Sequence, residues 1–243
     1  MGEQTPFSIV VPARNEEATI ESVLSVVRPM TDDLVVVDGR SSDRTVAIAE
    51  EYRARVVQDH GLGKGDAVRV GLEHVRHPIT VFIDADGSHD PADIPKLVEP
   101  IIMGEADLVM GSRMLGGSEE LFGSLYEVTR LIGSLVISLT INYRFGVRFT
   151  DYQNGFRAIR TDVGRKIGMT SNITTIEQEM AMKCLQHGYR VAERPTHESR
   201  RQGGNSKISV MRVAHLYVLN LIQGVLVRRT GDREIAAGSD PTA

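Results

Sequence analysis

Val81-Phe82-Ile83-Asp84-Ala85-Asp86-Gly87-Ser88-His89-Asp90-Pro91 is the stretch of this 243-residue chain that says most about its fold. Residues 80–83 are apolar or β-prone and predict a buried strand that ends on two aspartates. Side chains two residues apart in a strand point the same way, so Asp84 and Asp86 can converge on one hard cation. Open α/β sheets bind ligands at the carboxyl ends of their strands. The stretch predicts a metal site with positions left for phosphate oxygens, although Asp, Gly and Ser are also common in polar turns.

Short β-branched runs alternate with helical patterns through the first half of the chain. The predicted strands are 7–11, 34–37, 55–57, 80–83 and 107–110. Apolar residues recur at helical spacing in 20–27 and 94–101, and Asn15 and Asp43 are expected to be N-caps. Strands that alternate with helices predict an α/β fold, in which a mainly parallel sheet is covered by helices on both faces.

The second half of the sequence has a different character. Segments 156–159 and 189–192 resemble further strands, while 131–141 and 213–227 are apolar but too short to cross a bilayer. These two apolar segments are expected to be core helices or amphipathic helices that lie in a membrane interface. The polar segment 230–243 is predicted to be a disordered tail.

The composition excludes several classes of protein. A formal net charge of −4 argues against a nucleic-acid binder, which usually carries a basic surplus. The single cysteine, Cys184, excludes an internal disulfide framework and fits a reducing compartment. Neither a secretory signal nor an apolar run of 18 residues is evident. A cytoplasmic location is therefore expected.

Four predicted strand ends carry polar loops to the same edge of the sheet. Carboxylates in such loops can accept hydrogen bonds from a base and a ribose, while Lys64 in a glycine-rich turn before a helix favours an anion. Each loop alone is a weak signal, but together they predict a nucleotide pocket. The loops are Pro12-Ala13-Arg14-Asn15-Glu16-Glu17, Asp38-Gly39-Arg40-Ser41-Ser42-Asp43-Arg44-Thr45, Gly61-Leu62-Gly63-Lys64-Gly65-Asp66 and Asp84-Ala85-Asp86.

These loops resemble those of the family 2 glycosyltransferases with the Rossmann-like GT-A fold. The second half narrows the resemblance to the dolichol-phosphate (polyprenyl-phosphate) mannose synthase group, and the likeness extends from about residue 7 to residue 207. The motifs that carry it there are Gly111-Ser112-Arg113, Asp151-x-x-Asn154-Gly155-Phe156-Arg157, Glu179-Met180 and Arg201-x-x-Gly204-x-Ser206-Lys207.

The resemblance implies a single GT-A domain over residues 1–229. Its nucleotide-sugar-binding half would be 1–115 and its acceptor-binding half 116–229. It also implies transfer of a hexose from a nucleotide-diphosphate sugar, with GDP-mannose favoured and a UDP-hexose possible, to a polyprenyl phosphate with inversion. A phosphate acceptor is ionised near neutral pH and needs no general base, whereas the departing diphosphate needs Mg²⁺ or Mn²⁺ and cationic side chains.

The resemblance also implies a role for each residue that matches a motif. The donor nucleotide would contact Pro12, Arg14, Glu16, Asp38, Lys64 and Asp84. The metal would be held by Asp84, Asp86 and Ser88, with Asp86 the preferred direct ligand. The catalytic set would be Asp86, Arg113, Arg157, Arg201 and Lys207. Arg113 would lie near the sugar or the acceptor phosphate, and the other basic residues would gather around the acceptor phosphate and the departing diphosphate. Glu179 would hold sugar hydroxyls or a helix end. Without the resemblance, the arginines are equally well read as surface ion-pair partners.

The sequence departs from the group at three points. Arg40 stands where a small residue is common, Gly87 replaces an apolar residue, and the transmembrane helices of many lipid-phosphate glycosyltransferases are lacking. The chain would therefore rest on the bilayer, as a single copy or a homodimer, or be recruited by a membrane subunit. The alternative enzyme uses a small phosphorylated or carboxylated acceptor, as glucosyl-phosphoglycerate synthases do. A third hypothesis, a non-catalytic nucleotide-sugar-binding subunit, is disfavoured by the complete set of site residues.

Overall fold

The computed structural model of the chain describes residues 5–119, 125–200 and 210–226. Arg201, Lys207 and the predicted tail 230–243 lie outside these residues. The strands are β1 (Phe7–Ala13), β2 (Asp33–Asp38), β3 (Arg55–Gln58), β4 (Ile79–Phe82), β5 (Leu108–Ser112), β6 (Arg157–Arg160) and β7 (Val191–Pro195). The helices are α1 (Ile20–Val27), α2 (Thr45–Glu51), α3 (Lys64–His74), α4 (Ile94–Ile102), α5 (Arg113–Gly116), α6 (Leu125–Phe145), α7 (Thr161–Lys166), α8 (Ile176–Gln186) and α9 (Val210–Leu226).

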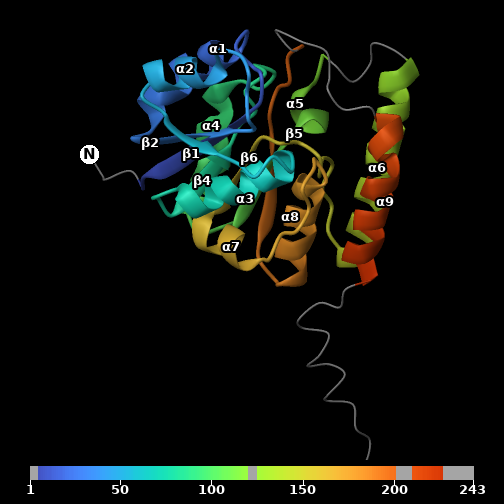
Figure 1. The fold of residues 1–243 in the computed structure, drawn as a ribbon. Coiled ribbons are helices and arrows are strands. Elements are labelled where there is room, and N and C mark those ends of the chain that lie inside the picture. The colour runs from blue at the N-terminus through green and yellow to red at the C-terminus, as the bar shows by residue number, and fades with distance from the viewer. Residues whose placement is uncertain (1–4, 120–124, 201–209, 227–243) are drawn as a thin grey trace, which may run out of the picture.

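The strands form one seven-stranded sheet in the order β3-β2-β1-β4-β6-β5-β7 (Figure 1). β6 runs antiparallel to both β4 and β5, and every other neighbouring pair is parallel. Because β1, β2, β3 and β4 are mutually parallel, the loops that follow them emerge at one edge. The predicted mainly parallel α/β sheet is confirmed.

Two hydrophobic cores lie on opposite faces of the sheet because successive side chains of a strand alternate. Ile9 and Val11 of β1 pack in one core with residues of α1, α2 and α4. Val10 packs in the other core with residues of α3, α7 and α8. Figure 1 shows α1, α2 and α4 above the strands and α3, α7 and α8 below them. The predicted helical cover on both faces is therefore also confirmed.

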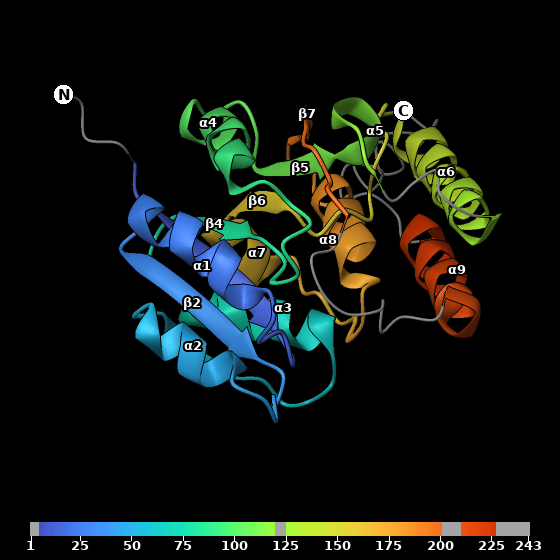
Figure 2. The ribbon, with the colours of Figure 1, turned by 90° about the horizontal axis from the view of Figure 1, so that it is seen from above.

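Helices α6 and α9 lie side by side against the outer side of α8 (Figures 1 and 2). Each is amphipathic: Ile137 and Ile141 of α6 and Leu221 of α9 are buried, while other apolar side chains of both helices are exposed. Among the helices in the described ranges, none combines the length and the apolar character needed to cross a membrane.

The start of α1 differs from the sequence prediction. The N-cap of α1 is Thr19, and Asn15 has a left-handed backbone with φ of 53°. The side-chain oxygen of Asn15 instead accepts the N–H of Ser42, 2.8 Å away, so Asn15 ties the loop after β1 to the loop after β2. The N-cap prediction at Asn15 was wrong because a polar residue after a strand can bond to a neighbouring loop as readily as to its own helix.

Candidate active site

The predicted aspartate pair follows β4 directly. The Asp86 side chain is buried, and its Oδ1 accepts hydrogen bonds from the backbone N–H of Ser88 at 3.1 Å and from the Ser88 hydroxyl at 2.7 Å. A turn of this kind fixes the carboxylate at the edge of the sheet. Asp84 is partly exposed and points to a small pocket at this edge. The pocket is lined by Pro12, Lys64, Val68, Phe82, Asp84, Gly155, Arg157, Ile176, Glu177 and Met180.

Lys64, the first residue of α3, lies between two carboxylates in this pocket. Its Nζ is 2.7 Å from Oδ1 and 2.9 Å from Oδ2 of Asp84, and 2.9 Å from Oε1 of Glu177. Burial alone lowers the pKa of a lysine, but the two carboxylates outweigh it and raise the pKa of Lys64. The lysine is therefore a fixed positive charge beside the candidate metal aspartates. Glu177 was not predicted from the sequence.

Glycine is required on two sides of Lys64. A Cβ on Gly155 would lie 2.6 Å from Nζ of Lys64 and 2.8 Å from Oδ2 of Asp84, so the chain passes directly over this ion pair. A Cβ on Gly65 would lie 2.1 Å from the carbonyl oxygen of Ser171. The N–H of Gly65 also donates to the carbonyl of Asn172 at 2.9 Å. The glycines of this turn thus allow close packing against residues 171 and 172. The N–H of Gly65 is bonded to a backbone carbonyl and not directed at an anion.

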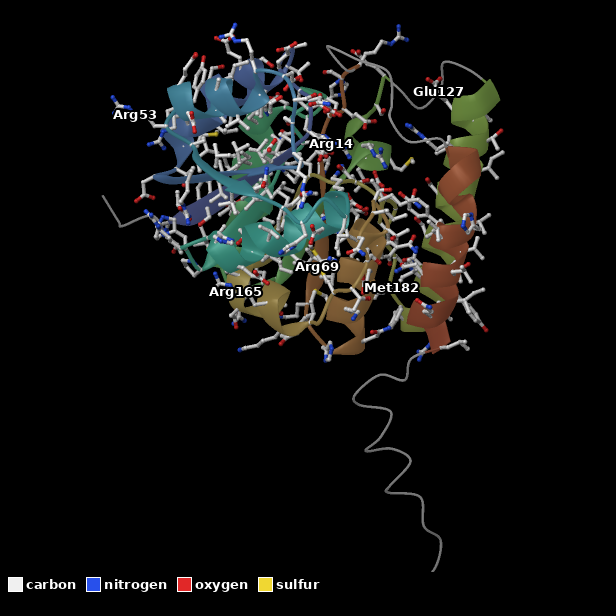
Figure 3. All side chains as sticks on the ribbon, in the orientation of Figure 1. Arg14, Arg53, Arg69, Glu127, Arg165 and Met182 are labelled. Carbon is white, nitrogen blue, oxygen red and sulfur yellow. The ribbon has the colours of Figure 1, made fainter. Side chains whose placement is uncertain are left out.

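The other predicted donor residues lie around the same edge. Asp38 ends β2 and is buried, and its carboxylate accepts the N–H of Ser41 at 3.1 Å. Glu16 is half-buried, and its backbone N–H donates to the Thr45 hydroxyl. Arg14, labelled in Figure 3, follows β1. It packs against Gly39, where an added Cβ would lie 3.1 Å from the Cβ of Arg14. The structure therefore brings the loops after β1 and β2 together, as the parallel strands predicted.

Arg113 is held by two carboxylates. Its Nε and Nη2 donate to both oxygens of Asp151, at 2.6 and 3.0 Å, and its Nη1 donates to Glu198 at 3.3 Å. A bidentate pair of this kind fixes the plane of the guanidinium. Asp151 and Glu198 are both buried. The predicted catalytic arginine is therefore part of a charged cluster that joins the start of α5 to the segments before β6 and after β7.

Arg157, the first residue of β6, is a buried cation whose partners are carbonyl oxygens. Its guanidinium donates to the backbone oxygens of Tyr152 at 3.2 Å, of Asn154 at 3.0 Å and of Glu177 at 2.6 Å. Burial lowers its pKa. The guanidinium lines the pocket, but these donors hold the loop before β6 and the first turn of α8. The geometry shows a positioning role for Arg157 in the protein itself.

The two acids of α8 face different surroundings. Residues two apart on a helix are separated by about 200° around its axis, so both cannot face one pocket. Glu177 lines the pocket, whereas Glu179 accepts the N–H groups of Thr170 at 2.9 Å and Ser171 at 2.8 Å. These donors, acting against burial, lower the pKa of Glu179. In this structure Glu179 holds the loop before α8, and its predicted contact with a sugar remains a prediction.

The aspartate loop is bonded to the segment that follows β7. His89 forms an isolated antiparallel bridge with Glu198, and the N–H of Ser199 donates to the carbonyl of Ser88 at 2.8 Å. His89 is buried and stacks on Phe156 with ring centroids 5.2 Å apart. Ser199 therefore lies directly beside Ser88.

The donor atoms at this edge fit a hard divalent cation that takes few ligands from the protein. Asp84, Asp86 and Ser88 offer only oxygen atoms, which Mg²⁺ and Mn²⁺ prefer. No group of three or more His, Cys, Asp and Glu side chains in the described part of the chain is arranged to hold a metal ion. The oxygens of a diphosphate are ligands of the same hard kind.

The sequence of the chain is similar to that of a known protein family. Residues 8–168 match the model of glycosyl transferase family 2. A dolichyl-phosphate hexose transferase of Haloferax volcanii is 31% identical over 205 residues, which cover 83% of this chain and 86% of that protein. An undecaprenyl-phosphate mannosyltransferase of Micrococcus luteus is 31% identical over 215 residues, which cover 82% of this chain and 86% of that protein.

A solved structure supports the fold assignment. Glucosyl-3-phosphoglycerate synthase of Mycobacterium tuberculosis, crystallised with Mn²⁺, UDP and glucosyl-3-phosphoglycerate, matches with a TM-score of 0.71. The match covers 93% of this chain and 82% of that one at 23% identity, so it speaks for the fold alone. The predicted resemblance is confirmed: the chain belongs to glycosyl transferase family 2 and is a glycosyltransferase with the GT-A fold.

Proposed function

We propose that this glycosyltransferase moves a hexose from a nucleotide-diphosphate hexose, with GDP-mannose as the favoured donor, to a polyprenyl phosphate. We choose a lipid-linked acceptor because α6 and α9 have an exposed apolar face. The two relatives named for dolichyl-phosphate and undecaprenyl-phosphate transfer support the same acceptor class. The pocket with Asp84 and Lys64 supports a donor that carries a diphosphate.

The apolar face of α6 and α9 suits a lipid surface. Its exposed side chains include Leu139 at 67%, Tyr143 at 94% and Leu226 at 75% exposure. The sequence holds no charged residue in 131–143 or in 213–227, and an arginine flanks each of these segments at both ends. Apolar helices bordered by arginines bind the acyl boundary of a bilayer while the arginines reach lipid phosphates. We infer that the protein is a peripheral protein of the cytoplasmic membrane face.

In the proposed reaction the acceptor phosphate attacks the anomeric carbon directly, with inversion. That phosphate is ionised near neutral pH, so no side chain need remove a proton from it. Asp84, Asp86 and Ser88 would hold a divalent cation, which would stabilise the charge on the departing diphosphate. Arg113 is a candidate for the acceptor phosphate, together with Arg201 and Lys207.

A screen of donors against acceptors tests the proposed function. The protein with Mn²⁺ or Mg²⁺ is incubated with GDP-mannose, UDP-glucose or UDP-galactose, and with polyprenyl phosphate in detergent or with 3-phosphoglycerate. Released nucleoside diphosphate and the glycosylated product are measured. We expect mannosyl polyprenyl phosphate to form from GDP-mannose. Transfer to 3-phosphoglycerate with none to the lipid would reject the proposed acceptor and support a small anionic one.

Charged residues on the apolar face are expected to release the protein from membranes. The double variant Leu139→Glu, Ile222→Glu should reduce co-sedimentation with anionic liposomes at least about tenfold, because each buried carboxylate opposes insertion. Leu139 is 67% exposed and Ile222 48% exposed, so the melting temperature should not change by more than a few degrees. Met103→Glu, an exposed apolar residue after α4, is the matched control. Equal sedimentation of the double variant and the parent would reject this membrane contact.

A further inference from the structure

Glu177 is a buried carboxylate that is only half satisfied. Its Oε1 receives the ammonium of Lys64 at 2.9 Å, but its buried Oε2 accepts no hydrogen bond from any residue that the structure describes. Leaving an acceptor of a buried charge without a donor is costly, and folded proteins avoid it where function does not require it. The position of Glu177 in the first turn of α8 favours a negative charge but supplies no hydrogen bond to Oε2.

Lys64 is shared between Glu177 and Asp84. An ammonium has three N–H donors, and the two oxygens of Asp84 and one of Glu177 account for them. Asp84 is also a predicted cation ligand, and a carboxylate that binds a cation is a poorer partner for an ammonium. When Asp84 turns to other partners, the bond to Glu177 is the one that keeps Nζ in the pocket.

We propose that Glu177 is a positioning residue for the donor: it holds the Lys64 ammonium in the pocket while Lys64 turns its remaining N–H groups from Asp84 to the diphosphate. This inference rests on the proposed function, because it takes the donor to carry a diphosphate. Gly155 supports the geometry, since the absence of a side chain there leaves room for Nζ between the carboxylates. The role belongs to Glu177 and not to Glu179, whose carboxylate is bonded to residues 170 and 171.

Isothermal titration of the full chain with GDP, with and without Mn²⁺, tests the proposal. Glu177→Gln keeps the shape of the side chain but removes the charge, and we expect the affinity for GDP to fall about tenfold. Glu177→Asp keeps the charge on a shorter side chain and should give an intermediate affinity. Glu73→Gln makes the same chemical change at an exposed position of α3 and should bind GDP as the parent does.

A double-mutant cycle with Lys64→Met separates positioning from a general structural effect. If Glu177 acts through Lys64, Glu177→Gln should cause no further loss of GDP affinity in the Lys64→Met background. An equal loss in both backgrounds, or a parental affinity in Glu177→Gln, would overturn the proposal. Thermal melting shows whether each variant is folded. If Glu177→Gln does not fold, the same cycle is measured with Glu177→Asp. Failure of the parent chain to bind either GDP or UDP would instead reject the proposed nucleotide donor.

Discussion

Asp86→Asn is expected to lower the rate of sugar transfer on the order of a thousandfold. The carboxylate of Asp86 is the preferred protein ligand of the proposed cation, and an amide oxygen carries no charge to hold it. Losing the cation removes several kcal/mol of stabilisation from the departing diphosphate. The asparagine oxygen can still accept the N–H and the hydroxyl of Ser88, so the loop should keep its shape. Released nucleoside diphosphate measures the rate, and circular dichroism measures the melting temperature.

Asp90→Asn is the matched control for Asp86→Asn. Asp90 belongs to the same loop, but its side chain is exposed and accepts the N–H of Ala92 at the start of a short helical turn. We expect its rate to lie within about twofold of the parent, because neutral substitutions at exposed positions have small effects. A fully active Asp86→Asn protein, tested with Mn²⁺ and with Mg²⁺, would contradict the assignment of Asp86 as the metal ligand.

Arg157→Met is expected to have the largest effect on stability. The guanidinium is buried and donates to the carbonyls of Tyr152, Asn154 and Glu177. Methionine fills much of the same space but leaves all three carbonyls without these donors. Each buried carbonyl that loses its donor costs about 1–3 kcal/mol, so the free energy of unfolding should fall by about 3 kcal/mol or more in total. Urea denaturation monitored by circular dichroism measures this change.

Arg165→Met provides the comparison for Arg157→Met. Arg165 also donates to two carbonyls, those of Leu72 and Val75, but it lies on the outside of α7 and is exposed (Figure 3). Water can replace its donors, so we expect a loss of no more than about 1 kcal/mol. If the two variants were equally stable, the bonds of Arg157 to the loop before β6 would not contribute to stability as the geometry indicates.

The sheet could be predicted from the sequence because its parallel strands are buried runs of Val, Ile and Leu that alternate with helical patterns. The antiparallel direction of β6 could not be predicted from the sequence. A strand's direction depends on the path of the chain before it, and β6 is separated from β5 by the long helix α6 and the loop that follows it. The periodicity of residues 157–160 is the same for either direction.

The loops of the candidate site could be predicted for a similar reason: parallel strands deliver them to one edge. Pro12, Lys64, Asp84 and Arg157 were named from the sequence, and they line one pocket. The pairing of charges could not be predicted, because the partners of Arg113 lie 38 and 85 residues away in the sequence. Glu177 was not predicted, because the rotation of α8 about its axis decides which side chain lines the pocket and is set by packing. The role predicted for Glu179 stays a prediction.

The position of β6 in the sheet limits which segments of the chain can be exchanged by recombination. β6 comes from the second half of the chain, yet it lies between β4 and β5 of the first half and pairs with both. A fragment that ends at residue 115 would leave β4 with one unpaired edge and β5 without either of its neighbours, and unpaired strand edges promote aggregation. Exchange of residues 1–115 alone would therefore transfer an incomplete sheet, without the strand that joins β4 to β5. Substitutions in the loops and helices around the sheet, in contrast, leave these strand pairings intact.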